Sequence, residues 1–199
     1  MHPAPTFRVA DEALLLAHLA RYPFVTLAAA VGGDVRAAHA PVVVRRLSDG
    51  LALDFHLSRR NALAAAITDG FRAVAVSLAA DAYISPDWYV SADQVPTWNY
   101  ISVEAEGPVA ALDDAGLVTL LDDLSAQQER RLAPKPPWTR SKMSPGRFEA
   151  MTGGIVGARI AVQRLEGTTK LSQEKSEADR AGVIAALGDH PIARRMRGE

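Results

Sequence analysis

The sequence predicts an α+β fold built around an antiparallel sheet of about six strands. Three observations predict it: segments rich in β-branched and aromatic residues, Gly- and Asp-containing turns between the first of them, and amphipathic segments inserted between the later ones. Strands joined by short turns run antiparallel, and six strands of this length suffice to close a small barrel. A doubly wound parallel sheet is not expected, and neither a GxGxxG nor a Walker sequence is present.

In the first half of the chain, one helix is predicted to precede a meander of strands. Asp11 is placed to cap a helix that runs to about Tyr22, with Leu15 and Leu19 on one face and Pro23 at its end. Turns at Gly32-Gly33-Asp34 and Ser48-Asp49-Gly50 separate the next strands. The predicted strands cover residues 24–30, 35–46, 51–58, 71–78, 98–111 and 155–165.

Later helices are predicted from apolar spacing and from capping residues. Asp113 and Asp114 open an amphipathic helix that ends at about Leu132, and Gly188 is the stop of another. The predicted helices after the first cover residues 61–68, 113–132, 176–187 and 191–197. Residues 133–146 carry four prolines and form a loop of functional length, or a plain surface crossover.

The amino-acid composition excludes several classes of function. The 199 residues fit one domain, 1–199, with a helical C-terminal segment at 176–197. Lys and Arg total 22 against 23 Asp and Glu, so the chain lacks the excess charge of a strongly basic nucleic-acid module. Without cysteine there is no disulfide, thiolate nucleophile or iron–sulfur cluster. No signal peptide or 18-residue apolar run is found, so we expect a cytoplasmic protein without a membrane partner.

One segment carries phosphate-binding chemistry at a predicted strand-to-helix junction. His56, Ser58, Arg59, Arg60 and Asn61 bring an imidazole, a hydroxyl, two guanidinium groups and an amide together. A helix N-terminus offers free N–H groups, and Arg grips phosphate with paired hydrogen bonds. The alternative is an ordinary helix cap beside solvated arginines.

Two further segments are rich in aromatic or cationic groups. Residues 83–100 hold five of the chain's 12 aromatic side chains, which predicts a wall for a flat ligand or, alternatively, a core corner with a dimer contact. Lys170-Leu171-Ser172-Gln173-Glu174-Lys175 supplies cations, a hydroxyl and an amide, or is a solvated turn. The histidines lack metal-ligand spacing and no GxSxG occurs, so no metal is expected and no catalytic residue is assigned.

Taken together, these segments resemble the PaiB-type family of FMN-binding negative transcriptional regulators. The resemblance runs through nearly the whole chain and is carried most specifically by Pro96-Thr97-Trp98-Asn99-Tyr100 and Lys170-Leu171-Ser172-Gln173. Its other blocks are Pro3 with Phe7, Pro23-Phe24, His39 to Pro41, His56 to Asn61, Ala82 to Pro86 with Trp88-Tyr89, Pro137-Trp138, and Asp179 to Leu187.

The resemblance implies a six-stranded split β-barrel that forms a homodimer with FMN at the subunit interface. The phosphate would lie near His56, Ser58, Arg59 and Arg60, beside Asn61, and the ring along the strand from His39 to Val43. The implied cofactor-binding set is completed by Thr97, Trp98, Asn99, Lys170, Ser172, Gln173 and Lys175.

The chain departs from the family pattern at several of these blocks. Ser58 stands where the pattern has Ala and adds a donor, while Ala62 replaces a Pro. Ala79-Ala80 replaces Gly-Pro, and Glu174 replaces an Asn. A carboxylate at Glu174 disfavours anionic ligands, so flavin affinity or redox role is expected to differ from that of relatives.

Three functions follow as hypotheses. The first is an FMN-dependent oxidoreductase or redox sensor that uses a nicotinamide or small-molecule reductant, with Lys170 and His56 as candidates for polarising a ligand. The second is a repressor that binds DNA directly through the helix-turn-helix-like segment 176–197, where Arg194, Arg195 and Arg197 meet phosphates. The third is a cofactor-free interaction dimer.

Overall fold

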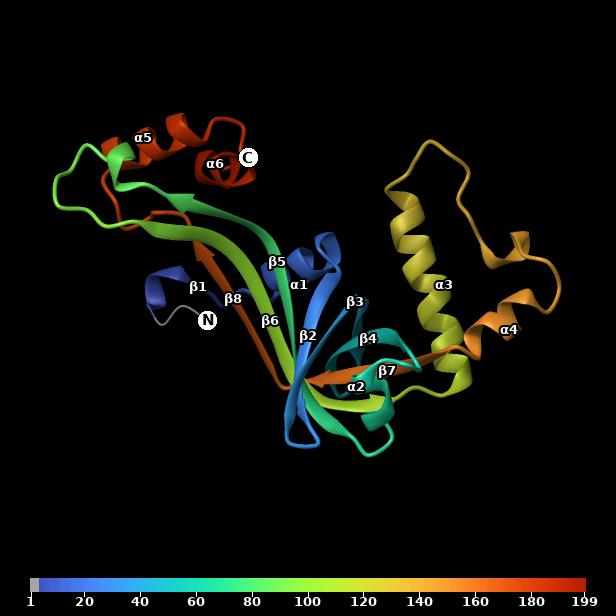
Figure 1. Ribbon diagram of the computed structural model, residues 1–199. Coiled ribbons are helices and arrows are strands. Elements are labelled where there is room, and N and C mark those ends of the chain that lie inside the picture. The colour runs from blue at the N-terminus through green and yellow to red at the C-terminus, as the bar shows by residue number, and fades with distance from the viewer. Residues whose placement is uncertain (1–3) are drawn as a thin grey trace.

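The computed structural model describes residues 4–199, and Pro3 of the predicted resemblance lies outside them. Its centre is an eight-stranded antiparallel sheet that closes on itself (Figure 1). The strands are β1 (Arg8–Val9), β2 (Phe24–Val31), β3 (Asp34–Leu47), β4 (Gly50–Ser58), β5 (Phe71–Ile84), β6 (Thr97–Ala111), β7 (Ile155–Val162) and β8 (Arg164–Lys170). They are ordered β1-β8-β6-β5-β2-β3-β4-β7, and an additional β6–β7 pairing closes the six strands from β6 to β7 into a barrel. The predicted α+β split barrel is confirmed.

The barrel closes because one edge of β6 pairs with two different strands. Residues 100–106 of β6 pair with β8, and residues 109–111 pair with β7. Between β7 and β8 the chain bends at Gln163, whose N–H donates to the Glu106 carbonyl at 2.8 Å. The prediction of one strand over 155–165 is therefore wrong in detail, because this bend divides it.

Gly107 makes the closure possible. It lies in β6 between the residues that pair with β8 and those that pair with β7. A Cβ at Gly107 would lie 1.8 Å from the carbonyl oxygen of Ala161 in β7. Any side chain there would force the two strands apart.

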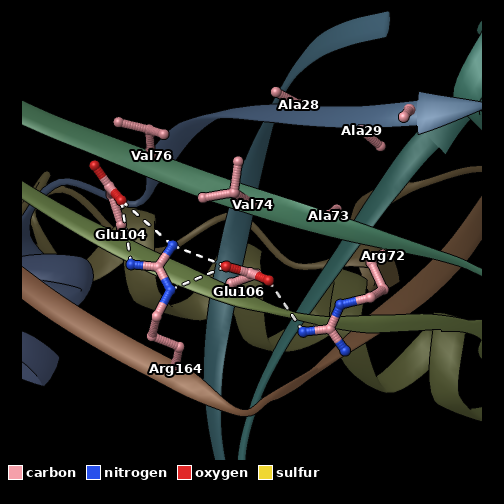
Figure 2. A pocket seen from close by; sticks show the side chains of 10 residues that line it. Ala28, Ala29, Arg72, Ala73, Val74, Val76, Glu104, Glu106 and Arg164 are labelled. Atoms are coloured by element: carbon pink, nitrogen blue, oxygen red, sulfur yellow. Dashed lines mark hydrogen bonds and ion pairs between the residues drawn. The ribbon is translucent and has the colours of Figure 1, made fainter. Parts of the chain in front are cut away.

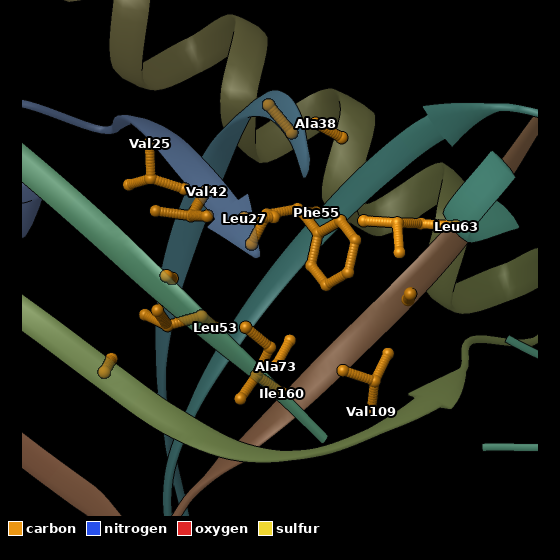
Figure 3. Packing of buried hydrophobic residues seen from close by; sticks show 14 of the residues in the cluster. Val25, Leu27, Ala38, Val42, Leu53, Phe55, Leu63, Ala73, Val109 and Ile160 are labelled. Carbon is orange, nitrogen blue, oxygen red and sulfur yellow. The ribbon is translucent and has the colours of Figure 1, made fainter. Parts of the chain in front are cut away.

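The barrel interior is filled by alternate residues of its strands (Figure 3). Leu27, Leu53, Phe55 and Ile160 are almost completely buried within one continuous cluster. In β4 the inward residues alternate along the strand, with Leu53, Phe55 and Leu57 directed into this cluster.

Helices cover the outside of the barrel and the far end of the sheet. They are η1 (Pro5–Phe7), α1 (Glu12–Arg21), α2 (Ala62–Ala66), η2 (Pro86–Trp88), α3 (Asp114–Arg130), η3 (Arg140–Lys142), α4 (Arg147–Thr152), α5 (Glu177–Leu187) and α6 (Pro191–Arg197). The predicted caps Asp11 and Asp113 each accept a backbone N–H, and so does Ser176, which caps α5. The short helix α4 and the two-residue strand β1 were not predicted. Among residues 4–199, no helix has the length and apolar character needed to cross a membrane.

The helix α3 packs over an outer patch of the barrel that is partly charged. Its Leu120 and Leu124 contact the outward-facing Val43. Beside them, the buried carboxylate of Asp54 accepts hydrogen bonds from Arg45 Nε at 2.9 Å and Arg159 Nε at 2.6 Å. Two guanidinium groups therefore neutralise this carboxylate under α3.

Beyond the barrel, β5 and β6 continue as a long arm, and β8 pairs with β6 along part of it (Figure 1). The last residue of β5 that pairs with β2 is Val76, whereas its pairing with β6 extends to Ile84. The helices α5 and α6 pack on this arm and form a second apolar cluster. This cluster includes Ile84, Tyr89, Ile101, Val183, Ile192 and Met196.

Asp179 of α5 holds the loop that follows η2. Its carboxylate accepts the N–H groups of Val90 and Ser91, at 2.9 and 3.0 Å, and the hydroxyls of Ser91 and Ser176. The Ser91 hydrogen bonds, first that of its backbone N–H, lower the pKa of Asp179 to about 2. The ionised carboxylate thus joins α5 to the arm loop.

We predict that Gly107→Ala destabilises the fold by about 3 kcal/mol or more, because the added Cβ collides with backbone. Chemical denaturation measures this loss. Gly153→Ala is the matched control, since its Cβ would meet nothing closer than 3.6 Å. Equal stability of the two variants would contradict the closure argument.

A second prediction concerns pH. The pKa of Asp179 is depressed to about 2 in the fold, against about 3.9 in an unfolded chain, so its stabilisation is present above that range and is lost as pH falls toward 2. Asp179→Asn should therefore lower the melting temperature at pH 7, and the gap from wild type should close at acid pH. Asp87→Asn, an exposed carboxyl on the same arm, is the control. A gap that stays constant with pH would count against this role.

Candidate functional site

Most of the predicted cofactor-binding residues fall into two groups at opposite ends of the molecule. Residues 58–61, here called the clamp, join β4 to α2 at the barrel end. Thr97, Trp98, Lys170 and Lys175, here called the distal cluster, lie at the outer part of the arm where α5 packs. Figure 1 shows the arm and α2 on different sides of the molecule. One subunit therefore does not bring the two groups together.

The clamp is a tight turn whose polar groups are partly committed to the turn itself. Ser58 Oγ accepts the N–H of Arg60 at 3.3 Å, and Asn61 Oδ1 accepts the N–H of Leu63 at 2.9 Å. The Nε of Arg59 donates to the Gly153 carbonyl at 3.0 Å. The helix α2 has only five residues, and Asn61 already caps it. The free helical N–H groups that the sequence predicted for phosphate binding are therefore not the main feature of the clamp.

The clamp arginines carry positive charge that no carboxylate offsets. Arg59 and Arg60 are exposed, and within the described part of the chain neither forms an ion pair. The other side of the Arg59 guanidinium is free for a second acceptor. Two guanidinium groups and a hydroxyl suit a dianionic phosphate.

His39 and His56 occupy different surfaces. His39 is exposed on β3, with Nδ1 3.2 Å from Thr26 Oγ1 and its ring stacked at 6.2 Å on that of Phe24. His56 instead lines a cavity beneath α3, and burial lowers its pKa. His56 is thus separate from the exposed side chains of the clamp.

The distal cluster combines exposed aromatic rings with two lysines. Trp98 is 53% exposed and meets Tyr83 edge-to-face at 6.1 Å. Lys170 Nζ donates to Thr97 Oγ1 at 2.5 Å, and Lys175 Nζ donates to Gln94 Oε1 at 2.8 Å. The aromatic pair and the lysines lie at the same end of the arm, where Lys170 Nζ is 5.6 Å from the centre of the Phe7 ring and Lys175 Nζ is 5.2 Å from that of Tyr89.

The same region is held together by the side chains of Asn99, Ser172 and Gln173. Asn99 is 0% exposed, and its Nδ2 donates to Ser172 Oγ at 2.9 Å. Gln173 Nε2 donates to the Thr169 carbonyl at 2.6 Å and accepts from Leu171 N–H at 2.7 Å through its other amide atom. Their side chains face the protein, so in this chain they position the turn that carries Lys170 and Lys175.

A feature that the sequence reasoning missed is the outer face of β2, β5, β6 and β8 (Figure 2). Small side chains such as Ala28 and Val74 border a hollow of about 350 Å³. Arg164 bridges Glu104 and Glu106, and Arg72 also pairs with Glu106. The hydrogen bond from Arg72, and then that from Arg164, lowers the pKa of Glu106. The alternating Glu and Arg residues of β6 and β8 were the available signal.

Comparison with known proteins gives a family and a set of curated relatives. A family model described as "Putative FMN-binding domain" matches residues 1–164. The "Protease synthase and sporulation protein PAI 2" of Bacillus subtilis is 36% identical over 117 residues, which are 58% of this chain and 55% of the relative. An uncharacterised protein of Emericella nidulans is 30% identical over 118 residues, 53% of this chain and 47% of that protein. The chain spans about half the length of these curated relatives.

Solved structures share the fold at low sequence identity. The FAD and heme binding protein from Mycobacterium smegmatis has a TM-score of 0.57 at 19% identity, covering 92% of this chain and 81% of that one. The flavocytochrome Anf3 from Azotobacter vinelandii has a TM-score of 0.57 at 15% identity, with 91% and 78% covered. The conserved protein Rv2991 from Mycobacterium tuberculosis has a TM-score of 0.59 at 15% identity, with 85% and 90% covered. Because the family model spans most of its length, the chain belongs to the FMN-binding-domain family, and FMN is the cofactor that this membership assigns to it.

Proposed function

We propose that the protein is a homodimeric flavoprotein with oxidoreductase or redox-sensing capacity, in which each FMN lies between the clamp of one subunit and the distal cluster of the other. The observation that carries this proposal is the separation of the two groups within one chain. Each group has only part of what FMN needs, because the clamp lacks an aromatic surface and the distal cluster lacks the guanidinium pair. Two copies related by a twofold axis supply two complete sites.

The clamp fits the phosphate end of FMN. Arg59 and Arg60 offer charge-assisted hydrogen bonds to a dianion, and Ser58 adds a hydroxyl donor. Gly153, through its carbonyl, orients the Arg59 guanidinium without neutralising it. In this arrangement the clamp binds and orients the phosphate and takes no part in the chemistry.

The distal cluster fits the ring end. Trp98 and Tyr83 supply apolar surface, and Lys170 and Lys175 bring positive charge near it, held by Thr97 and Gln94. FMN, when bound, supplies hydride and electron exchange with a nicotinamide or another small reductant. Glu174 is exposed on the same turn and opposes that positive charge, which favours a weaker flavin site than one with a neutral residue there.

The outer face of the barrel fits the dimer contact. Small side chains of β2 and β5 leave it hollow, and its ionic groups balance, with Arg8, Arg72 and Arg164 set against Glu104, Glu106 and Glu166. A twofold contact brings a surface against a copy of itself, so a face with balanced charge avoids net repulsion.

Direct DNA binding has less support. The helix α6 buries Ile192 and Met196 against the arm, and Arg197 pairs with Glu199 at 2.8 Å. Exposed Arg194 and Arg195 remain on α6 as its unpaired cations among the described residues. Regulation in this protein is therefore proposed to pass through the flavin rather than through a recognition helix, and nanomolar, sequence-selective DNA binding at physiological salt would overturn that preference.

We predict that Arg60→Ala weakens FMN binding about 10- to 100-fold, because it removes a charge-assisted phosphate contact without removing any contact within the fold. The measurement is flavin retained after gel filtration, read from its visible absorption, with affinity from titration. Arg130→Ala removes an exposed arginine at the end of α3 and serves as the control. Unchanged affinity in Arg60→Ala would remove the clamp from the site.

We further predict that Ala28→Arg converts the dimer into a folded monomer that no longer retains FMN, because a long cation cannot fit against the same small-residue hollow of a second copy. Sedimentation velocity gives the oligomeric state, and circular dichroism verifies folding. Leu14→Arg, on an exposed position of α1, is the matched control. A monomer with wild-type flavin affinity would show that one chain suffices.

A further inference from the structure

A second cavity lies on the opposite side of the barrel wall from the core, between α3, η3 and α4. It encloses about 360 Å³ and opens beside Met151. Most of its lining is apolar or aromatic, contributed by Leu121, Trp138, Met143, Phe148, Met151 and Ile155. Such a lining with few polar groups is typical of a site for a small organic molecule.

Some of the polar groups that line this cavity are already paired. Asp122 and Arg140 form an ion pair at 3.2 Å, and the Thr152 hydroxyl donates to the Glu149 carbonyl at 2.9 Å. His56 and Ser125 also line the cavity, and no hydrogen bond of either side chain is found among the described residues. The Nδ1 of His56 is itself covered by protein, so a ligand in the cavity reaches the imidazole through its other nitrogen, Nε2.

Position on β4 explains why His56 faces this cavity. Phe55 and Leu57 point into the barrel, so the side chain between them points outward, under α3. There its ring lies among the apolar side chains that α3 and α4 contribute. A ligand on these walls therefore meets the His56 imidazole and the Ser125 hydroxyl as hydrogen-bonding groups.

We propose that this cavity binds a small uncharged hydroxyaromatic molecule, with its ring against Trp138 and Phe148 and its hydroxyl on Nε2 of the His56 imidazole. A phenolic hydroxyl both donates and accepts, so it can bond Nε2 in either imidazole tautomer. The ligand is uncharged because Asp122 and Arg140 already neutralise each other at the cavity wall. Aromatic and methionine side chains favour a flat ring over an aliphatic chain.

This site does not depend on the proposed flavin site. None of Ser58, Arg59, Arg60 or Asn61 lines the cavity. The two sites are nevertheless neighbours, because Arg59 donates to the carbonyl of Gly153, which follows the lining residue Thr152. Binding in the cavity should consequently persist in the full-length protein whether or not FMN is present.

The test compares p-cresol with toluene, which has the same ring and methyl group without the hydroxyl. Isothermal titration calorimetry on the purified full chain should give one p-cresol site per chain and an affinity about tenfold higher than for toluene. His56→Phe should abolish that preference and leave toluene binding intact. Arg59→Ala, in the neighbouring clamp, should bind p-cresol as wild type does.

Several results would overturn the proposal. They are undetectable p-cresol binding, equal affinity for the two probes in wild type, and a preference that survives in a folded His56→Phe. If that variant fails to fold, Met151→Asp replaces it, since Met151 is 56% exposed at the cavity mouth. A carboxylate there should weaken both probes about tenfold, and an unchanged affinity would place the probes elsewhere. Finally, displacement of p-cresol by stoichiometric FMN would overturn the separateness of the sites, while retention in the FMN-loaded protein supports it.

Discussion

The edge of β6 that is shared between β7 and β8 determines the shape of the molecule. Pairing with β7 closes the barrel, whereas pairing with β8 leaves β6 free to continue into the arm with β5. The bend at Gln163 and the missing Cβ of Gly107 are the local conditions for this change of partner. As a result, the barrel end and the arm end carry different chemical groups, and neither end folds back onto the other.

Strand β4 shows how one short segment can serve several purposes. Its inward residues fill the barrel, while the outward positions 54, 56 and 58 differ in role from one end of the strand to the other. Asp54 is paired with two arginines, His56 lies in an apolar cavity, and Ser58 begins the clamp. The outward side chains thus become more available for binding toward the end of the strand, where the backbone leaves the sheet and side chains reach solvent.

Much of the fold was predictable because its signals are local. Segments rich in β-branched and aromatic residues, with turns between them, indicated the barrel strands, and the caps Asp11 and Asp113 marked helix starts correctly. The bend at Gln163 was not predictable, because neither Gly nor Pro stands there. The short elements β1 and α4 lack enough residues to show any period.

The candidate site was only partly predictable. Residue types indicated phosphate and ring chemistry, but nothing in the order of residues showed that Arg59 and Trp98 would lie far apart. The burial of some site residues could not be predicted either, since Asn99 and Ser172 are polar and yet face each other inside the arm. The pairing of charges over the outer face depends on strand register, which becomes visible only once β6 and β8 are aligned.

Subunit complementation tests the shared-site claim most directly. A chain with Arg59→Ala and Arg60→Ala is mixed with a differently tagged chain carrying Trp98→Ala and Lys170→Ala, and heterodimers are purified through both tags. If each site takes its clamp from one subunit and its distal cluster from the other, neither variant retains FMN alone, while the heterodimer regains one intact site and binds one FMN. Heterodimers without flavin, formed from folded chains, would contradict the account, because a site contained in a single chain cannot be restored by mixing.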